Sequence, residues 1–125
     1  MINIIKWDDA IKNCNYDKSV GIKIAKLTSY DTFSTFVTEI DANKSVNPHY
    51  HKKGNEHYHI ISGNGEIQLK NVFTGEECSH EVSAGQSFIV PENVLHKLIN
   101  TSSTSPLVLM FSCPLSHLES DRYFL

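Results

Sequence analysis

The chain has 125 residues, of which 40% are hydrophobic, so we expect one domain with one core over residues 1–125. Its formal net charge is -3 and Arg122 is its single arginine, which excludes the basic stripe that binding to nucleic-acid phosphates requires. The apolar runs are too short to span a bilayer, and acidic residues follow directly after the few apolar residues at the start, unlike the basic start and sustained apolar stretch of a secretory signal. We therefore expect a cytoplasmic protein that binds neither membrane nor nucleic acid.

The first expected element is a short helical turn at residues 7–12. Nine strand segments, most of them short and several alternating between apolar and polar residues, follow at residues 20–27, 33–40, 45–51, 56–62, 66–72, 77–82, 87–90, 95–100 and 107–113. Asparagine, glycine and proline separate these segments at the spacing of an antiparallel sandwich or barrel. A second helical turn is expected at residues 115–122, after Pro114. The sequence therefore predicts an all-β fold with short helical turns near its ends.

Three cysteines, Cys14, Cys78 and Cys113, are widely spaced and form no C-x-x-C pair. An odd number of such cysteines indicates neither a disulfide framework nor a zinc knuckle, so we expect reduced thiols. Cys78 and Cys113 lie in alternating or apolar segments, where a free cysteine usually behaves as a small hydrophobe.

Four side chains of metal-ligand type are grouped in two short segments, with His49, His51 and Glu56 in the first and His96 in the second. His49 and His51 are two residues apart, so on a strand both rings project from one face. Glu56 begins the next strand segment and would bring a carboxylate beside them. Three imidazoles and one carboxylate suit one divalent first-row metal ion (iron, manganese, nickel, cobalt or zinc) and leave coordination positions open for water or substrate.

These segments resemble the paired motifs of the cupin superfamily, whose members are small jelly-roll barrels, or double-stranded β-helices, that hold one metal ion inside. The first motif corresponds to His49, His51, Glu56 and Gly63, and the second to Gly85, Pro91, His96 and Asn100. The resemblance implies this fold and makes the three histidines and Glu56 the metal ligands. Asn43 and Asn93 stand where the family usually has glycine. Asparagine tolerates positive φ better than most residues, so both positions can still turn the chain.

Strand alternation assigns the faces of the segment that begins at Glu56. If Glu56 faces inward, so do Tyr58 and Ile60, whereas His57 and His59 face outward and are not expected to be ligands. Tyr58 is therefore the candidate catalytic residue, for orienting substrate or relaying a proton. Other residues that the pattern places inside the barrel are candidates for substrate contact, namely Phe36, Thr38, Gln68, Phe88 and Tyr123.

Three functions are compatible with such a site, because one fold hosts many reactions. The first is an isomerase, epimerase or lyase acting on a small hydroxylated carbonyl compound such as a sugar or sugar acid. The second is an Fe(II)-dependent dioxygenase, and the third is a non-catalytic small-molecule-binding protein whose metal is structural. A phosphosugar is disfavoured as the substrate, because phosphate recognition favours arginine and the chain has only Arg122.

Four apolar residues lie near the start of the chain, at Ile2, Ile4, Ile5 and Trp7. This segment could cover an open sheet edge of a second copy, and the cupin resemblance also implies association, so we expect a homodimer. The alternative is that the segment packs on the barrel of its own chain.

Overall fold

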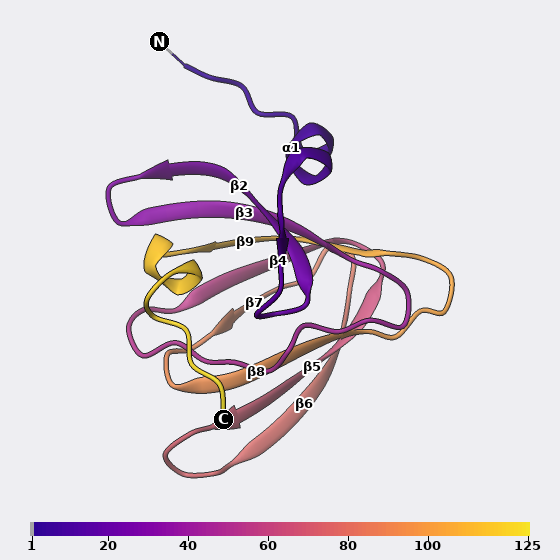
Figure 1. The fold of residues 1–125 in the computed structure, drawn as a ribbon. Coiled ribbons are helices and arrows are strands. Elements are labelled where there is room, and N and C mark those ends of the chain that lie inside the picture. Colours follow the sequence, from indigo (N-terminus) through magenta and orange to yellow (C-terminus); the bar gives the residue numbers. More distant parts are fainter. Residues whose placement is uncertain (1) are drawn as a thin grey trace.

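The computed structural model describes residues 2–125, in which nine strands and two short helices follow one another along the chain (Figure 1). The helices are α1 (Trp7–Asn13) and the 3-10 helix η1 (Leu115–Leu118). The strands are β1 (Tyr16–Asp17), β2 (Ile22–Tyr30), β3 (Phe33–Ile40), β4 (Glu56–Ser62), β5 (Asn64–Asn71), β6 (Glu77–Ser83), β7 (Ser87–Val90), β8 (Val94–Asn100) and β9 (Leu107–Cys113). The predicted all-β fold with short terminal helices is confirmed.

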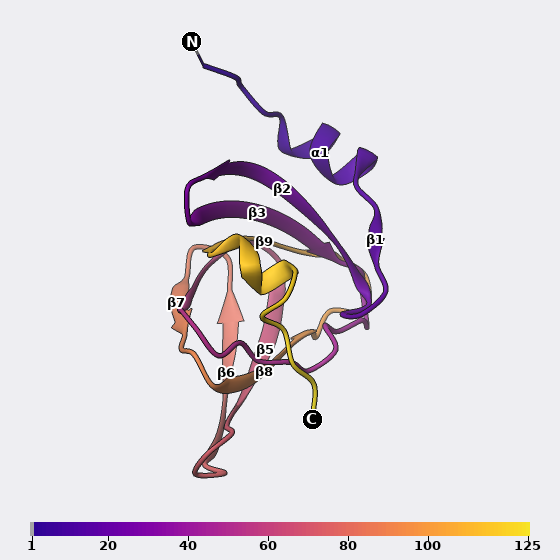
Figure 2. The same ribbon diagram turned by 60° about the vertical axis from the view of Figure 1, so that its left-hand side comes forward.

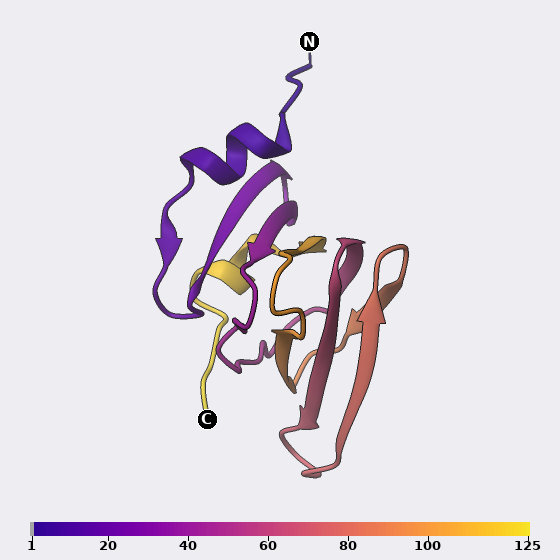
Figure 3. The ribbon, with the colours of Figure 1, turned by 90° about the vertical axis from the view of Figure 1, so that its right-hand side faces the viewer.

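Two antiparallel sheets pack face to face and enclose the core. One sheet has six strands in the order β1-β2-β3-β9-β4-β7, and the other has three in the order β6-β5-β8. Figure 3 shows the two layers and places α1 on the outer side of β2. There Ala10 and Ile11 pack on Ala25, Leu27 and Val37. In Figure 2 the C-terminal helix η1 lies in front of the sandwich, between the two layers, so the end of the chain covers one end of the core.

The core is built from the inward faces of both sheets. Its largest fully buried apolar side chains are Phe36, Ile40, Ile67, Leu98, Leu107 and Leu109. Burial in β4 alternates as predicted, because Glu56, Tyr58 and Ile60 are buried while His57 is exposed. This alternation carries one carboxylate and one phenol into the interior, where η1 lies against the carboxylate.

The two asparagines in place of motif glycines do turn the chain. Asn43 has a φ of 63° and Asn93 a φ of 60°, so both occupy the left-handed region that asparagine tolerates. Gly63 shows why glycine is retained elsewhere, since its φ is 93° and an added Cβ would lie 2.6 Å from the carbonyl oxygen of Pro106. The turn chemistry of both motifs is therefore intact.

Strand bounds agree with the prediction for β3, β4, β7 and β9, and differ by one to three residues for β2, β5, β6 and β8. The predicted strand at residues 45–51 is wrong as a continuous element. Its residues form only isolated bridges, Ser45 with Ile99, His49 with His96 and Tyr50 with Tyr123. Pro48 interrupts the ladder here because it has no N–H to donate. The second helical turn is also shorter than predicted and ends at Leu118.

The described residues include no helix long and apolar enough to cross a membrane. A cytoplasmic location stays a prediction of the sequence.

The N-terminal segment extends away from the sandwich (Figure 1). Ile2 is 85% exposed and Ile4 83% exposed, so the alternative that these side chains pack on their own barrel is wrong. The homodimer stays a prediction.

Candidate metal centre

The three predicted histidine ligands come together although His96 lies on a different segment from His49 and His51. His49 and His96 exchange backbone hydrogen bonds of 3.3 and 2.9 Å, and this bridge sets their rings 4.4 Å apart between centroids. The ring of His51 lies 5.1 Å from that of His49 and 5.4 Å from that of His96. All three side chains are buried, and one ring nitrogen from each lies within 4.8 Å of the others.

Each of these rings is oriented by a hydrogen bond from Nδ1 to a backbone carbonyl. His49 donates to Asn47 at 2.8 Å, His51 to Asp121 at 2.6 Å and His96 to Val94 at 3.0 Å. A carbonyl oxygen only accepts, so Nδ1 carries the proton and Nε2 presents a lone pair. Metal-binding histidines are normally held in this way.

The carboxylate of Glu56 faces these lone pairs. Its Oε2 lies 3.3 Å from Nε2 of His51 and its Oε1 lies 3.5 Å from Nε2 of His96. Neither Nε2 atom has a hydrogen-bond partner within residues 2–125, and both are buried. Two acceptors that face each other in a buried site need a cation between them, because a buried unpaired polar group is costly.

Protonation of the histidines does not supply that cation at neutral pH. Burial lowers the pKa of His49 from 6.5 to about 3 and that of His51 from 6.5 to about 4. The rings of His49 and His51 are therefore neutral and available as ligands. Three imidazoles and one carboxylate, buried and convergent, fit a divalent first-row metal ion, so the residues predicted from sequence are able to hold one.

Tyr58 lies inside, next to this cluster, as predicted. Its hydroxyl donates a hydrogen bond of 3.0 Å to Oε1 of Glu56. Burial, together with the nearby charge of Glu56, raises the pKa of Tyr58 well above 10. The phenol therefore stays protonated and acts as a hydrogen-bond donor at neutral pH.

His117 is a member of the site that the sequence reasoning missed. It is fully buried, its Nε2 donates to the carbonyl oxygen of Lys53 at 2.6 Å, and its Nδ1 lies 3.0 Å from Oε2 of Glu56. Burial opposes a positive charge on this ring, but the hydrogen bonds to Glu56 and Lys53 and the charges of Glu56 and Asp121 outweigh it and raise the pKa of His117 above 6.5. The only signal in the sequence was a histidine in an apolar segment, which is equally typical of a core residue.

Glu56 is thus held from several sides. Burial alone would raise its pKa, but the hydrogen bond with His117 lowers it well below 4.5, so the group is a carboxylate. His51, Glu56 and His117 also lie within 4.8 Å of one another through their ligand atoms. Because both nitrogens of His117 already face oxygen atoms, we assign it to holding Glu56 rather than to coordination.

A small cavity of about 30 Å³ adjoins the cluster. Its lining combines ligand residues and Tyr58 with apolar side chains of both sheets and with Thr38, His117, Leu118 and Arg122. This volume holds on the order of two water molecules, since one occupies roughly 10–15 Å³ by the same measure. Three of the lining residues, His117, Leu118 and Arg122, belong to the C-terminal segment, residues 114–125. This segment therefore forms one wall of the cavity.

Of the other predicted substrate contacts, Thr38 lines this cavity, whereas Phe36 packs in the core against Phe111 with ring centroids 5.1 Å apart. Gln68 is wrong as a candidate, because it is exposed and hydrogen-bonds to Glu66 at 2.7 Å. Tyr123 is also outside the cavity. Its ring lies under the ammonium group of Lys52, with 4.1 Å from Nζ to the ring centroid, and Phe88 is not among the lining residues either.

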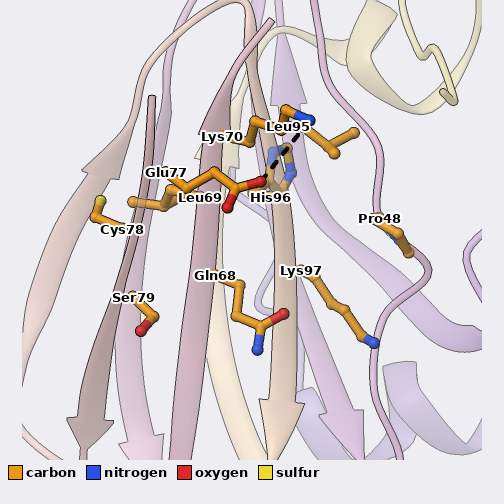
Figure 4. Close-up of a pocket in the computed structure, with 10 residues that line it drawn as sticks. All are labelled: Pro48, Gln68, Leu69, Lys70, Glu77, Cys78, Ser79, Leu95, His96 and Lys97. Carbon is orange, nitrogen blue, oxygen red and sulfur yellow. Dashed lines mark ion pairs between the residues drawn. The ribbon is translucent and has the colours of Figure 1, made fainter. Parts of the chain in front are cut away.

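A larger depression of about 650 Å³ lies on the sheet formed by β5, β6 and β8 (Figure 4). Gln68 and Lys97 stand beside each other there, and an ion pair of 3.7 Å joins Lys70 and Glu77. Both side chains of that pair are substantially exposed. The depression adjoins His96 but offers no second cluster of metal-ligand side chains within the described residues, so we place the site in the interior cavity.

Comparison with known proteins places this chain in a family. The family model described as the cupin domain matches residues 36–113, which is more than half of the chain. A search of curated proteins gave no significant match.

Solved structures with the same fold include the capsular polysaccharide assembling protein CapF from Staphylococcus aureus, with 22% identity and a TM-score of 0.74 over 90% of this chain and 33% of that one. Oxalate decarboxylase from Lactobacillus farciminis, in a formate complex, has 18% identity and a TM-score of 0.71 over 85% of this chain and 31% of that one. An oxalate decarboxylase of Bacillus subtilis has 19% identity and a TM-score of 0.70 over 82% and 28%. This chain spans about a third of the length of these proteins or less.

Proposed function

Because this chain belongs to the cupin family, we propose that it is a metal-dependent isomerase, epimerase or lyase acting on a small hydroxylated carbonyl compound such as a sugar or sugar acid. His49, His51, Glu56 and His96 are the proposed metal ligands. The observation that carries the proposal is the pair of buried, unpaired Nε2 atoms that face the Glu56 carboxylate, with the protonated hydroxyl of Tyr58 beside them.

A divalent ion at this position would act as a Lewis acid on a carbonyl or hydroxyl oxygen of the substrate. The chain itself supplies the remaining parts of the reaction. Tyr58 holds a proton next to Glu56, and its hydroxyl would turn from Oε1 of Glu56 to donate to a substrate oxygen. Apolar side chains such as Ile24, Leu109 and Phe111 line the cavity and exclude water from the proton transfer.

The structural neighbours support the two halves of this proposal. CapF is described as a capsular polysaccharide assembling protein, which supports a sugar-derived substrate. Other neighbours include oxalate decarboxylases, which supports a lyase that acts on a small acid. Both likenesses are of fold, at identities of 22% and below.

A non-catalytic protein with a structural metal is the second candidate. The small volume of the cavity, about 30 Å³, and its closure by Leu118 and Arg122 of the C-terminal segment favour it. A structural metal would have a closed coordination sphere without an exchangeable water molecule.

Solvent deuterium exchange tests the proposal. Untagged protein loaded with Mn(II), Co(II) or Zn(II) is incubated in heavy water with small hydroxy acids and hydroxy ketones, and proton NMR follows the carbon next to the carbonyl group. We expect this proton signal to be lost only when metal is present. Isomerases and epimerases of this kind remove that proton from the carbon, and deuterium from the solvent then replaces it. The same reaction with His51→Ala protein is the control.

Two results would replace the proposal. Absence of exchange together with a Mn(II) site that holds no exchangeable water, measured by water proton relaxation, would favour the structural metal. Consumption of oxygen by the Fe(II)-loaded protein with one of these compounds would favour the dioxygenase.

A further inference from the structure

Arg122, the single arginine of the chain, lies on the wall of the metal cavity. Its side chain is only 9% exposed, and it lines the same cavity as His49, Glu56 and Tyr58. The C-terminal segment brings it there from a position far along the chain from every predicted ligand. A buried positive charge in a small cavity requires partners, because a buried charge is favourable only when it is paired and hydrogen-bonded.

The partners of this guanidinium are incomplete. Nη1 lies 3.0 Å from Oδ2 of Asp17, which ties the C-terminal segment to β1. Nε is buried and has no hydrogen-bond partner within residues 2–125. In a guanidinium the Nε–H and one Nη2–H point in the same direction and form one edge of the group. Asp17 contacts Nη1, which lies outside this edge, so the Nε–H donor has no acceptor.

We propose that this edge of Arg122 binds the carboxylate of the substrate, and that the substrate is a small carboxylate anion with a hydroxyl or carbonyl oxygen next to the acid group. This rests on the proposed function, since the second oxygen would reach the metal bound by the histidines and Glu56. Arginine matches the planar, two-oxygen carboxylate in geometry as well as in charge. Binding at these two points would fix the carbon atom next to the acid group, which carries the hydroxyl or carbonyl oxygen.

Charge favours a small carboxylate over a phosphate ester. One edge of one arginine matches the two oxygens of a carboxylate and is not the cluster of cations that phosphate recognition prefers. The Glu56 carboxylate would repel an anion, but a divalent metal and Arg122 together outweigh it in charge.

Arginine NMR gives a direct readout, because a chain with one arginine has one Nε–H signal and its assignment is unambiguous. Sodium glycolate, sodium acetate and inorganic phosphate are titrated separately into metal-free and Zn(II)-loaded protein, with sodium chloride at matched ionic strength. We expect glycolate to shift the Arg122 signal saturably, with at least tenfold tighter binding than phosphate and tighter binding in the Zn(II)-loaded protein than in the metal-free protein.

Two variants separate binding from a structural role. Arg122→Lys keeps the charge but loses the two-donor edge, and we expect it to bind glycolate at least tenfold more weakly with unchanged zinc stoichiometry. Asp17→Asn removes the ion pair and keeps the guanidinium, so we expect glycolate affinity within about threefold of the original protein. If Arg122 served only to hold the C-terminal segment, both variants would lower the midpoint of thermal unfolding and neither would act on glycolate alone.

The proposal fails if the wild-type Arg122 signal does not respond to glycolate, if chloride shifts it equally, or if phosphate binds more tightly. These results need no variant and so do not depend on how a variant folds. Deuterium exchange on a substrate without any effect at Arg122 would overturn this inference and leave the proposed function standing. A saturable shift of the Arg122 signal by glycolate, without deuterium exchange on any compound, would support carboxylate binding at Arg122 and count against the proposed function.

Discussion

The imidazole rings of His51 and His117 lie face to face, with centroids 4.0 Å apart and planes inclined by only 5°. Both approach the same oxygen of Glu56, Nε2 of His51 at 3.3 Å and Nδ1 of His117 at 3.0 Å. His51 also donates to the carbonyl oxygen of Asp121, whose carboxylate accepts from the backbone N–H of Lys52 and of Lys53. The C-terminal segment is therefore part of the construction of the metal centre.

Replacing His51 by alanine should abolish stoichiometric metal binding. The change removes one of three convergent Nε2 atoms, and a site of two imidazoles and one carboxylate holds a divalent ion far more weakly. Metal content after dialysis against a trace concentration of Zn(II) measures the loss. His59→Ala is the matched control, because His59 faces away from the core and hydrogen-bonds to Ser87 at 2.8 Å. Full occupancy in the His51 variant would contradict the site.

Replacing His117 by glutamine should weaken metal binding without abolishing it. Residues that hydrogen-bond to a metal-binding side chain and orient it typically contribute about 10–100-fold to metal affinity. The variant should also be less stable, by about 3–5 kcal/mol if glutamine cannot replace the contact, because it breaks a buried charged pair with Glu56. Competition with a zinc-sensitive dye measures affinity, and thermal unfolding of the metal-free protein measures stability.

The control for this variant is His57→Gln, which changes an exposed histidine on the other face of β4. If His117→Gln bound metal as tightly as the original protein, His117 would be a core residue without a role in holding Glu56. Complete loss of metal from a folded variant would instead make His117 a ligand.

Much of the fold and the ligand set could be predicted because both depend on local patterns. The alternation of Glu56, Tyr58 and Ile60 along β4 was sufficient to place Tyr58 inside. The histidine ligands come together even though residues 45–51 do not form a continuous strand. The isolated bridge between His49 and His96 places these two residues side by side, as a continuous pair of strands would. A single backbone pair is enough to align two rings.

His117 and Arg122 could not be predicted from such patterns. Both reach the cavity only because the C-terminal segment folds back across one end of the sandwich, where Tyr123 pairs with Tyr50 through two backbone hydrogen bonds of 2.9 Å. No periodicity in residues 114–125 encodes that contact, and it depends on sequence positions more than sixty residues apart. Tertiary packing decides such placements, so the local sequence does not reveal them.

Acid should destabilise the metal-free protein as pH falls from about 6.5 toward 4. The pKa of His49 is about 3 and that of His51 about 4 in the folded protein, against 6.5 when unfolded. Between these values the unfolded chain binds protons that the folded chain does not, so stability is fully present above pH 6.5 and is lost as pH falls. The slope is about 1.4 kcal/mol per pH unit for each histidine.

His117 acts with the opposite sign, because its pKa is raised and its contribution is lost as pH rises through the folded pKa. Urea unfolding of metal-free protein between pH 4 and pH 8 measures the balance. His49→Gln should flatten the acid limb, whereas the exposed His57→Gln should leave it unchanged. A free energy of unfolding that stayed constant from pH 7 to pH 4.5 would contradict the depressed pKa values.

The protein is predicted to be a homodimer in solution. Ile2 and Ile4 are largely exposed, and β1 pairs with β2 only at Ile22 and Lys23, which leaves the rest of that edge of β2 open. Exposed edges invite pairing with another chain. Light scattering at micromolar concentration should give twice the chain mass of 14.1 kDa. A double change of Ile2 and Ile4 to serine should shift the mass toward the monomer, and a monomeric original protein would refute the prediction.

Replacing Tyr58 by phenylalanine should leave metal binding intact and slow turnover about a hundredfold, the usual contribution of one proton-transferring group. The variant keeps the ring, which packs against Phe88 and Phe111 at centroid distances of 5.2 and 5.6 Å, and removes only the hydroxyl that donates to Glu56. Since burial raises the pKa of Tyr58, its hydroxyl is protonated at neutral pH and would turn from Glu56 to donate to a substrate oxygen. Tyr50→Phe is the matched control, because its ring packs against that of Tyr123 outside the cavity, with centroids 5.5 Å apart. Metal content, the rate of deuterium exchange and its pH profile separate the possible results. A slower rate with full metal content assigns the hydroxyl to the reaction, a loss of metal assigns it to holding Glu56, and an unchanged rate removes Tyr58 from the mechanism.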